Sequence, residues 1–174
     1  MKTLRPFGPT LGKSKLSNKI IKIINNEVSK LSLNNKNDYS QELASQIKHE
    51  IKLSNSFVKK NLSKELIKNI NVYLTSLSVK NIKEIKIISL WIVRQFKNEY
   101  NPIHYHEGQL SGVGYLLVPK KMTQNILVKN KKIKTNGTID FINGQKNFLS
   151  NSIYNLKPKV GDLMIFPNYL MHTA

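Results

Sequence analysis

Three of the four histidines in this 174-residue chain have the spacing of a metal site. His104 and His106 lie two residues apart, so an extended strand would place both imidazoles on one face. Ile103 and Tyr105 would then point the other way, into packing. Two imidazoles on one face can bind one metal ion at about 2.1 Å. A third ligand could come from His172, which lies far downstream.

The residues before His172 favour its position as the third ligand beside His104 and His106. The chain runs through a tight turn at Gly161-Asp162, a short apolar strand at 163–166 and Pro167 before it reaches this histidine. A double-stranded β-helix brings early and late strands side by side, so the third ligand could complete the site. The chain has no cysteine, which excludes thiolate ligands and disulfides. His49, in a helical stretch, is interpreted as a solvated residue.

The charge balance has a compositional explanation. The formal net charge is +18, which would ordinarily raise binding to nucleic acid or to an anionic membrane surface. Of the 28 basic residues, however, 26 are lysines, and asparagine (21) and isoleucine (20) are also abundant. An A/T-rich genome would produce this joint excess at tolerant surface positions. Specific nucleic-acid readers rely on arginine, and only Arg5 and Arg94 are present. We therefore expect no specific nucleic-acid binding.

Hydrophobic periodicity predicts helices first and strands afterwards. The apolar stripes of the first half have helical spacing and predict helices over 17–33, 40–52 and 62–78, with Ser17 or Asn18 and then Ser63 as candidate caps. From residue 82 onward, alternation and turn residues predict strands over 85–94, 110–118, 138–142, 148–156 and 163–166. The lysine-rich segment Lys120–Lys134 has no acidic or aromatic residue, and we expect it to be an exposed loop away from the histidines.

This order predicts an α+β fold in which a helical N-terminal layer packs on a double-stranded β-helix (jelly-roll) core. We expect one structural domain, with an N-terminal helical region at 1–82 and the β-helix core at 83–174. No apolar run reaches the roughly 20 residues of a membrane helix, and the basic N-terminus is followed by no apolar segment typical of a signal peptide. A cytoplasmic protein without a membrane partner is the resulting prediction.

Several motifs carry a resemblance to a known family. They are the His-x-His pair followed by Leu110-Ser111-Gly112-Val113-Gly114-Tyr115-Leu116, and the segment from Gly161 to His172. The starting stretch 5–10 and the stretch 91–96 are also similar. Together they resemble the putative 2OG-Fe(II) oxygenase family of marine phages and bacteria, within the prolyl-4-hydroxylase-like superfamily. The resemblance spans nearly the whole chain and says nothing about which small molecule or protein side chain is the substrate.

The resemblance implies a dioxygenase of the hydroxylase type that uses Fe(II) and 2-oxoglutarate. It implies His104, His106 and His172 as metal ligands and catalytic residues. The superfamily usually has a carboxylate where this chain has His106. Either His106 is the third ligand or Glu107 replaces it from the next position. We favour His106, because Glu107 would face away on a straight strand, although a bulge could reverse this.

A second departure concerns 2-oxoglutarate. The superfamily usually places a basic residue on the strand after the distal histidine, where it pairs with the C5 carboxylate. This chain ends at Ala174, so we interpret the β-helix as C-terminally incomplete. Within the chain, Arg94 is a candidate for that contact, and Gln95 and Tyr115 are candidate hydrogen-bonding groups near the cofactor.

Two other functions stay open. One is a cupin-like three-His metalloenzyme that does not use 2-oxoglutarate, although cupins usually place a glutamate several residues after the His-x-His pair. The other is a non-enzymatic basic module that binds nucleic acid. Aromatic residues interleaved with the lysines of 120–134 would support that module, and there are none.

Overall fold

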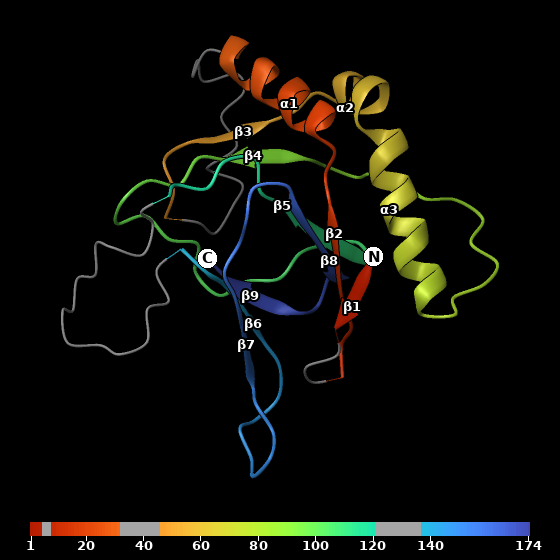
Figure 1. Ribbon diagram of the computed structural model, residues 1–174, viewed down its shortest axis with the longest axis vertical. Coiled ribbons are helices and arrows are strands. Elements are labelled where there is room, and N and C mark those ends of the chain that lie inside the picture. The colour runs from red at the N-terminus through yellow and green to blue at the C-terminus, as the bar shows by residue number, and fades with distance from the viewer. Residues whose placement is uncertain (5–7, 32–45, 121–136) are drawn as a thin grey trace.

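The computed structural model describes residues 1–4, 8–31, 46–120 and 137–174 (Figure 1). This part of the chain forms three helices and nine strands. In chain order they are β1 (Lys2–Leu4), β2 (Leu11–Lys15), α1 (Asn18–Lys30), β3 (Glu50–Lys52), α2 (Asn55–Asn61), α3 (Ser63–Ser76), β4 (Trp91–Val93), β5 (Leu110–Gly114), β6 (Ile139–Ile142), β7 (Ile153–Leu156), β8 (Asp162–Pro167) and β9 (Met171–Thr173).

The strands form three antiparallel sheets, and β8 is the most buried strand in them. The largest sheet has the order β1-β2-β8-β5, a second has the order β7-β6-β9, and β3 pairs with β4. Successive side chains of β8 point to opposite faces of its sheet. Leu163 and Ile165 therefore enter one hydrophobic core, and Met164 and Phe166 enter another.

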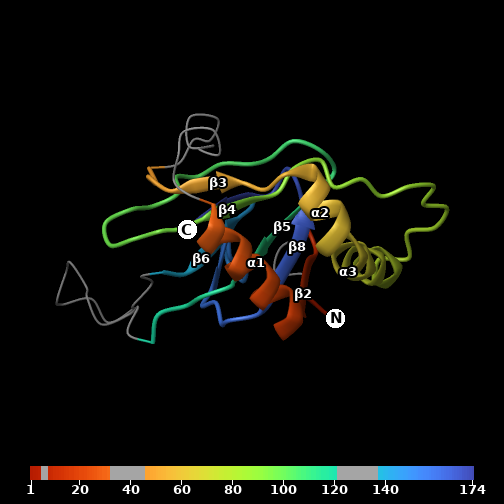
Figure 2. The same cartoon turned by 90° about the horizontal axis from the view of Figure 1, so that it is seen from above.

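The helices cover one face of the β8 sheet, and the β7-β6-β9 sheet packs against the other. In Figure 1 the helices lie along the top and right of the molecule, and the hairpin of β6 and β7 projects from the bottom; Figure 2 shows the three helices from above. The first core combines Leu163 and Ile165 with apolar side chains from the helices and their connections: Leu16, Ile20, Ile24, Leu53, Val58, Leu62 and Tyr73. The second core combines Met164 and Phe166 with Leu11, Ile139, Phe141, Leu156 and Leu170. The α+β class with N-terminal helices on antiparallel sheets is thus confirmed, while the jelly-roll arrangement and the domain limits remain predictions.

Two of the three predicted helices are present. The helix expected at 17–33 is α1, and its cap is Ser17, whose hydroxyl accepts the amide of Ile20 at 3.2 Å. The helix expected at 62–78 is α3, but Ser63 does not cap it. The preceding α2 runs almost directly into α3, and the Ser63 hydroxyl donates instead to the carbonyl of Val58. None of the helices in the described ranges is long and apolar enough to cross a membrane.

The prediction of a helix at 40–52 is wrong for residues 46–52, which the structure describes. Residues 46–49 form no helix, and Glu50–Lys52 is the strand β3. The regular spacing of Ile47 and Ile51 resembles a helical stripe, but both side chains are buried by tertiary contacts, and Ile51 pairs with Ile92 of β4. Residues 40–45 lie outside the described residues.

The predicted strands are present but mostly shorter. Of the strand expected at 85–94 only Trp91–Val93 forms, because its partner β3 offers only three residues for pairing. The strand expected at 110–118 ends at Gly114, and that expected at 148–156 begins at Ile153. The strands β1, β2 and β9 and the helix α2 were not predicted. Apart from Lys120, which is exposed, the segment Lys120–Lys134 lies outside the described residues.

A tight contact between Gly12 and Tyr73 fixes how closely α3 approaches the β8 sheet. A Cβ atom at Gly12 would lie 2.5 Å from the Tyr73 ring, which is fully buried. We expect Gly12→Ala to lower the free energy of unfolding by about 1–3 kcal/mol, because the ring has no room to move. Urea denaturation would measure this. In a Gly12→Ala, Tyr73→Leu double variant the loss in the free energy of unfolding should be smaller than the sum of the losses in the two single variants. Strictly additive losses would contradict the contact.

Candidate metal site

Backbone pairing brings the three candidate histidines together from distant parts of the chain. His172 lies on β9, whereas His104 and His106 lie on the extended segment before β5. The backbone amide of His104 donates to the carbonyl of His172 at 3.1 Å, and the amide of His172 donates back at 3.0 Å. This antiparallel bridge places the segment beside β9, on the side opposite β6. Residues that are directly opposite in such a pair point to the same face.

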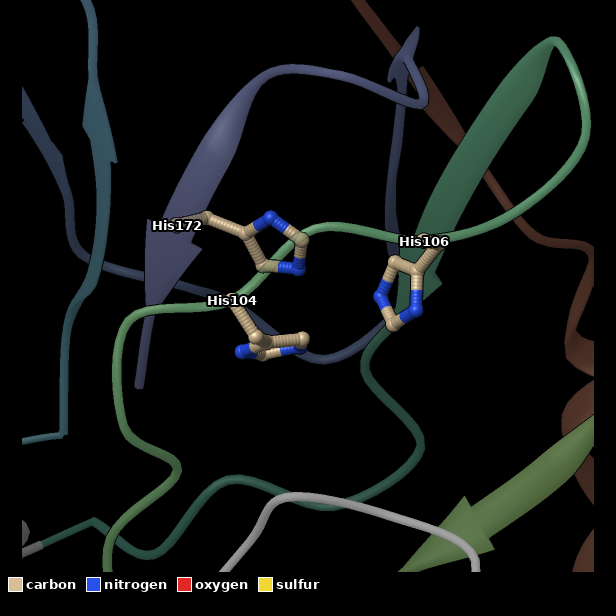
Figure 3. A group of neighbouring side chains, drawn as sticks. All are labelled: His104, His106 and His172. Carbon is tan, nitrogen blue, oxygen red and sulfur yellow. The ribbon is translucent and has the colours of Figure 1, made fainter.

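The three imidazoles surround one point (Figure 3). The ring centroids are 4.3 Å apart for His104 and His172, 4.8 Å for His104 and His106, and 5.0 Å for His106 and His172. One nitrogen from each ring lies within 4.8 Å of the other two, so the group could hold a metal ion. The convergence expected from the sequence is therefore observed, and the role of these residues as ligands is taken up below.

Backbone carbonyls orient two of the rings. The Nδ1 atom of His104 lies 2.7 Å from the carbonyl oxygen of Pro102, and Nδ1 of His172 lies 3.0 Å from that of Leu170. A carbonyl only accepts hydrogen bonds, so the proton of each neutral ring sits on Nδ1 and the lone pair is on Nε2. Histidine ligands in metal sites characteristically donate their other ring N–H in this way. Both rings are thus held in the tautomer that offers Nε2 as a ligand.

Aromatic side chains enclose the histidines. The Phe166 ring lies 5.0 Å from the His172 ring, and Phe141, the residue opposite His172 in the sheet, lies at 6.2 Å. The Trp91 ring packs edge-on against His106 at 5.4 Å. His172 is only 5% exposed, and the other two histidines are half-buried. The enclosure lowers the local polarity and limits the access of water.

Burial favours the neutral form of His106 and His172. Burial, followed by the neighbouring rings of His104 and His106, lowers the pKa of His172 to about 4. Burial, followed by the charge of His104, likewise lowers the pKa of His106 to about 4. An imidazole can bind a metal only through a deprotonated nitrogen. At neutral pH these two rings are therefore in the form that binds metals.

Glu107 lies outside the cluster. Its side chain is exposed, and the group that could hold a metal contains His106. Ile103 and Tyr105 are also exposed, at 59% and 66%, so the expectation that they point into packing is wrong. They do alternate with the histidines, but the outer face of this segment is turned toward solvent rather than toward a core.

The three candidate cofactor contacts lie in different surroundings. Arg94 and Gln95 are exposed just after β4, where the Arg94 guanidinium lies 5.7 Å from the Phe96 ring centre and the Gln95 amide donates to the carbonyl of Glu99. Tyr115 follows β5 and is partly buried against the second core. Burial, and secondarily the charge of Asp162, raises the pKa of its phenol, so the group stays protonated. Their proposed contacts with a cofactor remain predictions.

The histidine cluster lies entirely within a segment that matches a known family. Residues 89–174 match the model of the family described as putative 2OG-Fe(II) oxygenase. This part of the chain belongs to that family. The family implies Fe(II) and 2-oxoglutarate as cofactors. No curated protein and no solved structure matches the chain.

Sequence reasoning missed the groups that support the histidines in this oxygenase-family segment. The carbonyls of Pro102 and Leu170 are backbone atoms, so no residue type reveals them. Trp91 did carry a signal, since it begins the family-like stretch 91–96. Its contact with His106 nevertheless depends on the pairing of β4 with β3, which was expected to be helical.

The lowered pKa values predict how stability depends on pH without metal. Unfolded histidines take up protons below a pH of about 6.5, whereas folded His172 and His106 do so only near pH 4. The unfolded state therefore binds more protons in this window, and the free energy of unfolding should fall as the pH drops from 6.5 to 4. His172, which is almost fully buried, should contribute up to about 3 kcal/mol.

Urea denaturation of the metal-free protein at several pH values would measure this dependence. His172→Gln should flatten the curve between pH 6.5 and 4, because one group with a lowered pKa is removed. The matched control is His49→Gln, which removes a histidine outside the cluster and should leave the slope unchanged. An equal pH dependence of the free energy of unfolding in the wild type and in His172→Gln would contradict the lowered pKa of His172.

Proposed function

We propose that this protein is an iron(II)- and 2-oxoglutarate-dependent dioxygenase of the hydroxylase type, with His104, His106 and His172 as its metal ligands. The observation that carries the proposal is the convergence of these three rings inside the segment that matches the oxygenase family. The strand β9 and an extended segment that is distant from it in the sequence contribute them, as expected for a site built against a β-sheet rather than for a chance surface cluster.

The donor set fits a catalytic Fe(II) ion. Imidazole nitrogen is a suitable ligand for iron, and ligands grouped on one side of the ion leave its other positions open. The Nδ1 hydrogen bonds of His104 and His172 fix the rings in the orientation that a ligand requires. His106 takes the place that a carboxylate has in the usual triad of two histidines and one carboxylate.

Bound Fe(II) with 2-oxoglutarate and dioxygen would supply the oxidation of a substrate C–H bond, coupled to decarboxylation of the keto acid. The chain's own contribution is to hold and shield that chemistry. The carbonyls of Pro102 and Leu170 keep the Nδ1 protons of two ligands in place. Phe166 and Trp91 pack against His172 and His106, and they limit the water that reaches the rings.

Arg94 is our candidate for the group that pairs with the distal carboxylate of 2-oxoglutarate. It directly follows β4, the strand whose Trp91 contacts His106. Within the described residues no carboxylate forms an ion pair with Arg94. Its guanidinium could therefore form a bidentate contact with a carboxylate ligand.

The neutral donor set also supports a second candidate, a three-His metalloenzyme that does not use 2-oxoglutarate. Among the described residues, the cluster contains three histidines and no carboxylate. The two candidates differ in one measurable property, because only the first forms a chelate between the keto acid and the metal.

Anaerobic loading with Fe(II) tests the proposed function. Addition of 2-oxoglutarate should produce a weak visible charge-transfer band, because the keto acid binds the metal directly, and succinate should form slowly in air without substrate. The His104→Ala, His106→Ala and His172→Ala variants should each lose the band. Glu107→Ala is the matched control and should retain it.

The outcomes separate the candidates. A band that survives His106→Ala but disappears in Glu107→Ala would make Glu107 the third ligand. Metal binding without any band or succinate would favour the three-His enzyme that does not use 2-oxoglutarate. Binding of the metal can be followed separately by fluorescence, since Trp91 is the chain's only tryptophan and contacts His106.

The proposed role of Arg94 gives a prediction of its own. Arg94→Ala should weaken 2-oxoglutarate binding by about 10- to 100-fold, the effect of losing a charge-assisted contact of about 1.5–3 kcal/mol. Titration of the visible band would measure it, and Fe(II) affinity should not change. Lys97→Ala removes an exposed charge nearby and serves as the control. Equal affinities in Arg94→Ala and the wild type would exclude this residue as the anchor.

A further inference from the structure

His106 differs from the other two histidines in how it is held. The His104 and His172 backbones pair with each other, and each ring has a carbonyl beside its Nδ1 atom. His106 lies beyond that pairing, on the stretch that turns toward β5. The turn includes Gly108, whose φ of +89° is one that side chains with a Cβ rarely adopt. Some other contact must therefore keep His106 at the position where its ring meets the other two.

Asn168 makes that contact. Its side-chain Nδ2 donates to the carbonyl of His106 at 3.0 Å. Its own backbone carbonyl accepts the amide of His106 at 3.2 Å, and its backbone amide donates to the carbonyl of Gln109, also at 3.2 Å. Three hydrogen bonds from one residue thus span the turn from His106 to Gln109.

The location of Asn168 links the position of His106 to that of His172. The residue lies in the connection between β8 and β9, four positions before His172. That connection also contains Leu170, whose carbonyl orients the His172 ring. One short segment therefore sets the positions of two of the three rings, His172 through the chain itself and His106 through Asn168.

We propose that Asn168 is the positioning residue for His106, and that its side-chain amide fixes the distance between His106 and the other two histidines. Two of its three hydrogen bonds use backbone atoms and are retained when the side chain is changed to alanine or aspartate. The side-chain bond to the His106 carbonyl is the part that depends on asparagine. The proposal rests on the proposed function where metal affinity is concerned, but the position of the His106 ring can be measured without metal.

The first measurement uses the metal-free protein. In the wild type, nuclear Overhauser contacts should connect the His106 ring to both the His172 ring and the Trp91 indole, since the centroids are 5.0 and 5.4 Å apart. Asn168→Ala should weaken these contacts and leave those between His104 and His172 intact. Asn168→Asp, which has the same shape but no donor, should do the same and covers the case in which the alanine variant does not fold.

The second measurement is the affinity for Co(II), followed by Trp91 fluorescence and by the visible spectrum of the ion. Asn168→Ala should lower the affinity about 10- to 100-fold, as expected when a residue that orients a ligand is removed. Asn61→Ala is the matched control, because the Asn61 side-chain amide also donates to a backbone carbonyl at 3.0 Å, that of Phe57, but lies on α2 outside the histidine cluster. It should change the affinity less than threefold.

The results distinguish the inference from the proposed function. A wild-type protein that binds no Co(II) would refute the metal site, while the ring contacts would still test Asn168. Unchanged His106 contacts in both Asn168 variants would overturn the inference. So would loss of the His104–His172 contacts to the same extent, because that would show a general structural role. Within a His106→Ala background, Asn168→Ala should have no further effect on Co(II) affinity, and an equal loss in both backgrounds would also overturn it.

Discussion

The pairing of the segment at 101–104 with β9 is the interaction on which the site depends. Asn101 and Ala174 exchange backbone hydrogen bonds at 2.7 and 3.3 Å, and His104 and His172 exchange another two. These four bonds join residues about 70 positions apart in the chain. A slip of one residue in this register would turn His104 or His172 to the opposite face and separate the rings. The convergence of the three histidines therefore depends on strand register before it depends on side-chain chemistry.

The register is in turn fixed by β8 and the turn that follows it. The strand is buried on both faces, because the helices cover Leu163 and Ile165 and the second sheet covers Met164 and Phe166. A strand held on both faces cannot slide without exposing apolar surface to water. The chain then turns within Pro167–Leu170 and returns as β9, with His172 against Phe166. The core thus determines where His172 of β9 lies.

The sequence predicted the convergence of the three histidines better than it predicted the surrounding elements. The spacing of His104 and His106 and the turn, strand and proline before His172 are local patterns, and the structure brings these three residues together. The strand β3 and the short β4 were not predictable in the same way. Their residues carry mixed apolar patterns, and only their mutual pairing decides between helix and strand.

The groups that hold the histidines in place could not be predicted from the sequence. No sequence pattern identifies Asn168, because its role depends on a carbonyl that lies 62 positions earlier in the chain. The carbonyls that orient His104 and His172 belong to any residue type. Residue types with strong metal chemistry can be recognised from sequence, whereas the bonds that aim them arise from the fold. Arg94, Gln95 and Tyr115 fall between these cases: their chemistry suits a cofactor, and the contacts they make in the fold are with the protein itself.

The neutral donor set has a consequence for what such a site would bind. Burial lowers the pKa values of His106 and His172 to about 4, so protons do not compete for their nitrogens at neutral pH. Three neutral ligands leave the full double charge on a divalent ion, whereas a carboxylate ligand would offset one unit of it. In an aromatic enclosure of low polarity an uncompensated charge is costly, and an anionic ligand relieves that cost. A keto acid that offers a carboxylate to the metal would supply the missing negative charge. A third histidine ligand in place of a carboxylate would thus be compatible with a co-substrate that is itself an anion.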